Sequence, residues 1–191
     1  MIHLARHGHT HNPDHLLYGN LPGFRLSRVG RWQAAQLGRR LAATRLAAVY
    51  SSPNQRAAET AWLAAGRRPI LLPALLDWEP DPEWVGKSWD DIPRLDPERW
   101  SQFRVKPWID ARPAAAVLRQ LAAFHIGDDV LVVGHQDPIR AVLNLLRPRP
   151  GSRLRDDPLP HGSLRTVDPR TWRVVQRWEP PAASDWPAGA L

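Results

Sequence analysis

The chain opens with the stretch IHLARHGHTHN, residues 2–12, where a short apolar run ends in an arginine, a histidine and a glycine. The apolar run predicts a buried β-strand, and the turn residues that follow it end the strand. In an open α/β sheet, ligands bind just beyond the carboxyl ends of the strands. Arg6 and His7 are therefore expected at that edge, where Gly8 lets the backbone approach a neighbour closely. The arginine fork suits phosphate or carboxylate, and the histidine suits a nucleophile or a proton carrier.

Strand and helix patterns alternate along the rest of the chain. Residues 130–133 are apolar throughout, as expected for a strand that is covered on both faces. Further strands are expected at residues 46–50, 70–72, 163–167 and 172–178, and helices at residues 28–44, 55–65, 97–105, 113–125 and 139–146. This alternation predicts an α/β fold, a three-layer α/β/α sandwich with a mostly parallel central sheet.

The length of 191 residues indicates one domain with a full hydrophobic core. We expect this domain to cover residues 1–180 and to be followed by a loose, Pro/Ala-rich tail over residues 181–191. Residues 75–96 hold several prolines and tryptophans and are too long for a simple connection. Long loops of this kind usually carry function or cover a site, and this one is referred to below as the excursion.

The chain is strongly basic, with a formal net charge of +7 and a sequence pI of about 11.0. Its basic residues are scattered, which leaves two interpretations open: binding to nucleic acid or a membrane surface, and attraction of small anionic substrates. No apolar run approaches the ~20 residues that cross a bilayer, and the first residues lack the apolar core of a secretory signal. Because there is no cysteine, the chain fits a reducing compartment, and we expect a cytoplasmic protein.

Three predicted strands end in polar residues that could share one pocket. The first ends at Arg6 and His7, the second runs into a turn with Arg56 on the helix beyond, and the central strand ends at His135. In a parallel sheet these ends lie along one edge, so two arginines and two histidines are expected to converge. Such a cluster suits a phosphoryl group, whose oxygens pair with arginine forks and with the N–H groups at a helix start.

Three segments around these residues together resemble the histidine phosphatase superfamily, also called phosphoglycerate-mutase-like. They are RHGHT at residues 6–10, SSPNQRAAET at residues 51–60 and GHQDPIR at residues 134–140. The resemblance covers about residues 1–146, with the segments in the family's order. It implies the phosphoglycerate-mutase-like fold for the catalytic domain and an enzyme of the histidine acid phosphatase type, which hydrolyses phosphate monoesters without a metal or other cofactor.

The resemblance also implies roles for individual residues. His7 would be the nucleophile that becomes a phosphohistidine, and it must be neutral at the attacking nitrogen. A backbone carbonyl that accepts from its other nitrogen would fix that tautomer. The phosphoryl group would be held, and its charge stabilised in the transition state, by Arg6, Arg56 and His135. Further contacts to phosphate are expected from Asn12 and Gln136.

A carboxylic acid near the pocket must give a proton to the leaving alkoxide. In the family this is usually a glutamate a few residues before a Trp-Glu-Gly in the excursion. The present chain departs from that pattern, because Val85 stands where the family often has glutamate, and the spacing back from Gly86 is shifted by one residue. A one-residue deletion would assign the proton donor to Glu79, with Asp77 and Glu83 as rivals.

Several alternatives remain open from the sequence. A phosphoglycerate mutase is the main enzymatic rival, although such mutases usually carry a longer excursion, and a non-catalytic anion-binding module could keep the same fold. A loop pattern close to that of dinuclear zinc hydrolases is formed by His9, His11, Asp14 and His15. Its spacing has one residue too many, so pocket-mouth residues are the favoured interpretation and no metal site is expected.

The expected ligand is a small phosphorylated metabolite, with neither nucleic acid nor membrane as a partner. Its identity would depend on the loops at residues 16–25 and 75–96, and the oligomeric state is not predicted. The ten tryptophans are interpreted mostly as core or loop packing. The alternative hypothesis is that Trp78, Trp84 and Trp89 form an apolar wall for the organic part of the substrate. His161 is interpreted as a turn residue.

Overall fold

The structure is a computed structural model that describes residues 1–103, 109–146 and 157–182. The strands are β1 (Ile2–Arg6), β2 (Leu46–Ser51), β3 (Ile70–Leu71), β4 (Asp129–Gly134), β5 (Leu164–Asp168) and β6 (Arg173–Trp178). The helices are α1 (Arg28–Leu41), α2 (Gln55–Ala65), α3 (Ile92–Leu95), α4 (Pro97–Phe103), α5 (Arg112–Phe124) and α6 (Gln136–Leu146), with a 3-10 turn at Pro73–Leu75. None of the helices in these ranges is long and apolar enough to cross a membrane.

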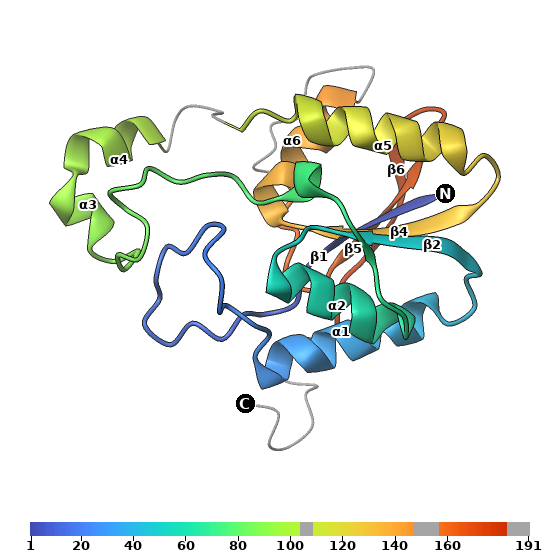
Figure 1. Cartoon of the computed structure of the whole chain (residues 1–191), viewed down its shortest axis with the longest axis horizontal. Helices are drawn as coiled ribbons and strands as arrows, with labels where there is room; N and C mark the ends of the chain where they lie inside the picture. The colour runs from blue at the N-terminus through green and yellow to red at the C-terminus, as the bar shows by residue number, and fades with distance from the viewer. Residues whose placement is uncertain (104–108, 147–156, 183–191) are drawn as a thin grey trace.

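The strands form a sheet whose order is β3-β2-β4-β1-β5-β6 in the described part of the chain. β1, β2, β3 and β4 are parallel, while β5 runs antiparallel to β1 and β6 antiparallel to β5. Helices α5 and α6 cover one face of the sheet and α1 and α2 cover the other (Figure 1). The expected three-layer sandwich with a mostly parallel sheet is therefore confirmed.

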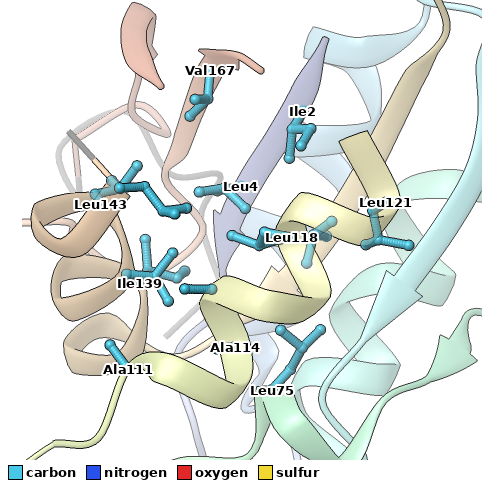
Figure 2. Close-up of a cluster of buried hydrophobic side chains, with 14 of the residues drawn as sticks. Ile2, Leu4, Leu75, Ala111, Ala114, Leu118, Leu121, Ile139, Leu143 and Val167 are labelled. Carbon is cyan, nitrogen blue, oxygen red and sulfur yellow. The ribbon is translucent and has the colours of Figure 1, made fainter. Parts of the chain in front are cut away.

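Strand β4 illustrates how the sequence pattern produces the layers. Val130 and Val132 pack into the cluster under α5 and α6, whereas Leu131 and Val133 pack into the cluster under α1 and α2. Figure 2 shows the first of these clusters, with Leu118 of α5 directed toward the strands. Because successive side chains of a strand point to opposite faces, a strand between two helical layers is apolar at every position.

The predicted elements exist, and their boundaries shift by a few residues. α1 ends at Leu41 instead of residue 44, but its N-cap is the expected one, since the Ser27 side chain accepts from the Gly30 N–H at 3.1 Å. α6 begins at Gln136 instead of residue 139 and so includes Pro138 in its first turn. Proline is tolerated there because the N–H groups of a first turn have no partner within the helix. Two predictions fall partly outside the described residues: the end of the helix at 97–105 and most of the tail at 181–191.

The backbone of α1 packs directly against the segment that follows β1. A Cβ atom at Gly8 would lie 2.4 Å from the Gly30 carbonyl oxygen, and one at Gly30 would lie 2.0 Å from the His9 carbonyl oxygen. Both distances are shorter than any real contact, so only glycine fits at either position. The close approach expected at Gly8 is therefore present, and it fixes the start of the loop after His7.

The loop after β1 and the excursion lie side by side at one end of the sheet (Figure 1). The Leu17 N–H donates to the Lys87 carbonyl and the Gly86 N–H donates to the Leu17 carbonyl, both at 2.8 Å. A separate apolar cluster of Leu17, Trp84 and Ile92 holds the two loops together. Trp84 is 5% exposed within that cluster, so the packing interpretation is confirmed for this residue and the substrate-wall hypothesis is wrong for it.

Candidate active site

A cavity of about 390 Å³ opens beyond the carboxyl ends of β1 and β4. The residues that line it include Arg6, His7, Asp77, Gln136 and His161. They come from four places that the fold brings together: the end of β1, the excursion, the segment that follows β4 and the segment that precedes β5. This is the edge of the sheet at which the sequence predicts a site.

His7 is buried, and its ring has a defined tautomer. Its Nδ1 lies 2.7 Å from the Gly8 carbonyl oxygen, which can only accept, so Nδ1 carries the proton. Burial lowers the pKa of His7 well below its ordinary value, and the neighbouring His135 and Arg56 act in the same direction. The ring is therefore neutral near pH 7, with an unprotonated Nε2, as a nucleophile requires.

His135 stands beside His7, with the two ring centroids 5.2 Å apart. Its Nε2 is 2.9 Å from the Ser52 hydroxyl and 3.3 Å from the Asn54 amide nitrogen, so the turn after β2 fixes the ring. Burial lowers the pKa of His135 well below its ordinary value, and the positive charge of Arg56 lowers it further. A second neutral imidazole thus stands beside His7.

Arg56 comes from the first turn of α2 and is 1% exposed. Like His135, it is buried next to the cavity and is not among the residues that line it. Its guanidinium donates to the Gly19 carbonyl at 2.8 Å and to the Asp77 carboxylate at 3.0 Å. The Asp77 carboxylate also lies 3.3 Å from Nδ1 of His135. Burial raises the pKa of Asp77, although the charge of Arg56 works against that change. Asp77 therefore links the arginine to the histidine, and its burial favours the protonated carboxyl group.

Arg6 is held differently from Arg56. Its guanidinium donates to the Leu159 carbonyl at 2.9 Å and to Nε2 of His161 at 2.8 Å, and neither acceptor carries a negative charge. Burial lowers the pKa of Arg6 to about 10, so it remains a cation at neutral pH. Among the described residues, neither Nε of Arg6 nor Nε of Arg56 has a hydrogen-bond partner. Buried, unsatisfied donors on cations are what an anion would satisfy.

The two residues for which the sequence predicts further phosphate contacts, Asn12 and Gln136, both line the cavity. Asn12 lines the cavity, and its side chain both donates to the Leu16 carbonyl at 2.9 Å and accepts from the Leu16 N–H at 3.0 Å. One of its amide hydrogens is thus used to close the loop. Gln136 is the first residue of α6 and also lines the cavity, so the start of this helix faces the site.

The carboxylate preferred from the sequence does not reach the cavity. Glu79 is exposed and is absent from the cavity lining, and Glu83 is exposed and pairs with Arg99 at 2.6 Å. Asp77, one of the two rivals of Glu79, lines the cavity instead. Asp77 and Glu79 lie in a loop without regular secondary structure, so their spacing does not decide which side chain faces the cavity, and a one-residue gap cannot be placed by spacing alone.

The histidines of the zinc-like pattern do not gather at one point. His9 contacts the Ser27 hydroxyl at 2.8 Å and His15 lies 3.3 Å from the Asp90 carboxylate, while His11 and Asp14 are exposed outside the cavity lining. Within the described ranges, no three histidine, cysteine or acidic side chains are placed to hold a metal ion. His9 and His15 line the cavity, as the favoured interpretation expects, whereas that interpretation is wrong for His11 and Asp14.

Sequence reasoning missed the part that His161 plays. The residue does lie in a turn, where the Ser163 N–H donates to the Pro160 carbonyl at 3.0 Å, but its ring enters the cavity 5.3 Å from that of His7. It belongs to none of the three segments that carry the family resemblance. The one available signal is its place just before β5, the antiparallel neighbour of β1.

A sequence profile of the histidine phosphatase superfamily (branch 1) matches residues 2–179, and the chain belongs to this superfamily. Rv0525, an uncharacterized protein of Mycobacterium tuberculosis, is 35% identical, with 82% of this chain and 82% of that protein covered. YhfR of Bacillus stearothermophilus is 28% identical, with a TM-score of 0.78 over 91% of this chain and 94% of that chain. The mycobacterial glucosyl-3-phosphoglycerate phosphatase Rv2419c, in complex with VO3, shares the fold at 21% identity, with a TM-score of 0.74 over 86% and 90% of the two chains.

Proposed function

We propose that this protein is a phosphatase of the histidine acid phosphatase type, which hydrolyses a small phosphate monoester through a phosphohistidine on His7. The observation that carries the proposal is the His7 ring: the Gly8 carbonyl fixes its proton on Nδ1 and leaves Nε2 free among cationic side chains. Membership of the superfamily supports the proposal, as does a solved phosphatase of the same fold.

In the first step, Nε2 of His7 attacks phosphorus, an N–P bond forms, and the P–O bond to the alcohol breaks. Arg6 and Arg56 stabilise the charge that spreads over the phosphoryl oxygens, so the proposal requires no metal or other cofactor. The departing alkoxide takes the proton of the Asp77 carboxylic acid. A bound phosphate dianion beside Asp77 raises its pKa further, because it brings a like charge close to the carboxylate.

In the second step, a water molecule attacks the phosphorus of the phosphohistidine. The Asp77 carboxylate takes a proton from that water, the P–N bond breaks, and inorganic phosphate leaves. His7 returns to its neutral form and Asp77 to its acid form, so the site is ready for another substrate. Two smaller barriers replace a single large one, which is the benefit of a covalent intermediate.

The organic part of the substrate would lie against Trp78 and Trp89, which line the outer cavity. This arrangement supports a small phosphorylated metabolite as the ligand. We include neither nucleic acid nor a membrane surface among the partners, because Arg6 faces a cavity and Arg56 is buried, so neither arginine of the site belongs to an exposed basic surface. The proposed compartment is the cytoplasm, supported by the absence of cysteine.

The test is release of inorganic phosphate from a panel of small phosphate monoesters, with and without a chelator. We expect release that the chelator does not reduce. Activity that disappears with the chelator and returns with Zn²⁺ would contradict the proposal. A phosphoglycerate added as acceptor separates hydrolysis from mutase activity, because a mutase would transfer the phosphoryl group to it instead of to water. Binding of phosphate without turnover of any ester would favour the anion-binding module.

A further inference from the structure

Arg6 and Arg56 differ in how their charges are compensated. Arg56 forms an ion pair with Asp77 at 3.0 Å. Arg6 has no carboxylate within ion-pair distance in the described part of the chain, and only Leu159 and His161 accept its hydrogen bonds. A neutral acceptor orients a guanidinium without cancelling its charge, whereas a carboxylate does both. Arg6 is therefore the cation that an incoming anion meets without a directly paired carboxylate.

His161 is well suited to orient the Arg6 guanidinium without neutralising its charge. Its Nε2 accepts from Arg6 at 2.8 Å, which requires an unprotonated nitrogen. Burial lowers the pKa of His161 to about 3, and the charge of Arg6 acts in the same direction. The ring therefore stays neutral over the range in which the protein would work, and it cannot repel the guanidinium that it holds.

The backbone around His161 is tied to the end of β1. The Gly162 N–H donates to the His7 carbonyl at 3.1 Å, and the Arg6 N–H donates to the Ser163 carbonyl at 3.0 Å. Leu159 is fully buried and has a φ of 38°, a left-handed conformation that a leucine rarely adopts. Residues held in such conformations cluster at functional sites, where the surrounding structure fixes them. The segment that presents both acceptors to Arg6 is thus anchored directly to the nucleophile strand.

We infer that His161 is a positioning residue, which aims the Arg6 guanidinium at the phosphoryl group and leaves its full positive charge to the ligand. This inference rests on the proposed function, since it assigns a ligand to that charge. His161 also lines the cavity, but the role assigned here acts through Arg6.

The test is binding of inorganic phosphate, measured by calorimetry, to the wild type and to four variants of His161. His161→Ala removes the acceptor, and we expect affinity to fall about 10- to 100-fold, as for a lost hydrogen bond to a charged group. His161→Gln places an amide oxygen near the position of Nε2 and should restore most of the affinity, whereas the shorter His161→Asn should not. His161→Glu should bind phosphate worse than His161→Ala, because its carboxylate neutralises Arg6.

A double-mutant cycle shows whether His161 acts through Arg6. In the Arg6→Ala background, His161→Ala should change phosphate affinity by less than about 2-fold, because its partner is gone. Thermal unfolding of each variant excludes a general loss of structure. Equal affinity of wild type and His161→Ala, or equal effects in the two backgrounds, would overturn the inference. Since binding is measured without turnover, a wild type that binds phosphate but hydrolyses no ester refutes the proposed function alone.

Discussion

Replacing His7 by asparagine should lower the rate of phosphate ester hydrolysis by about 10⁴-fold or more, because the reaction loses its nucleophile. Binding of inorganic phosphate should survive, since Arg6, Arg56 and His135 remain. The measurement is steady-state phosphate release together with calorimetric phosphate binding. If His7 is the nucleophile, turnover is lost while phosphate binding is retained. If His7 has only a structural role, both should be lost together.

The matched control is the same substitution four residues further on. His11 is exposed and lies outside the cavity lining, so His11→Asn should leave the rate within about 2-fold of wild type. Comparable losses in the two variants would mean that the loop tolerates no change, and would remove the support for His7 as nucleophile.

Asp77→Asn should lower kcat for alkyl phosphates by about 10²- to 10⁴-fold, the usual effect of removing a general acid. An asparagine cannot protonate an alkoxide. For p-nitrophenyl phosphate, whose leaving group needs no proton, the first step should be nearly unaffected. The second step still lacks its base, so phosphoenzyme should accumulate as a burst before slow turnover. Phosphate affinity should not fall, because Arg56 loses a competing carboxylate.

The pH dependence of ester hydrolysis also tests whether Asp77 is the general acid. The first step needs Asp77 protonated, so kcat/KM for an alkyl phosphate should fall as the pH rises through the Asp77 pKa, which burial raises. The fall at acid pH, from protonation of His7, should lie well below the ordinary histidine pKa. In Asp77→Asn the alkaline fall should disappear while the acid fall remains. An unchanged profile would exclude Asp77 as the acid.

Glu79→Gln decides between the sequence-based and the structure-based assignment of that acid. Glu79 is exposed, so this variant should keep wild-type kcat, leaving-group dependence and pH profile. If Glu79→Gln instead reproduced the losses expected of Asp77→Asn, the excursion would have to adopt another conformation when substrate binds.

The sheet edge was predictable from the sequence because periodicity and strand ends are local signals. β4 is apolar at every interior position, and the ends of β1 and β4 carry His7 and His135, so a parallel sheet must bring them together. The tautomer of His7 was likewise expected, as a requirement of its chemistry. The Gly8 carbonyl, one residue away, meets that requirement.

The proposed proton donor and the side-chain partner of Arg6 are harder to predict from the sequence, for different reasons. Asp77 and Glu79 are two residues apart in a loop without periodicity, so orientation depends on contacts such as that with Arg56 rather than on pattern. His161 is 155 positions from Arg6 and meets it only because β5 pairs antiparallel with β1. Tertiary pairing of this kind has no local signature, and a turn prediction was all that the sequence supported.

The covalent intermediate itself is the most direct measurement. Wild-type protein is mixed with ³²P-labelled ester, quenched in alkali within milliseconds, and digested for peptide mass spectrometry. We expect acid-labile, alkali-stable label on His7 at Nε2, formed at least as fast as turnover. No label on His7, or label on another residue with turnover intact, would contradict the account.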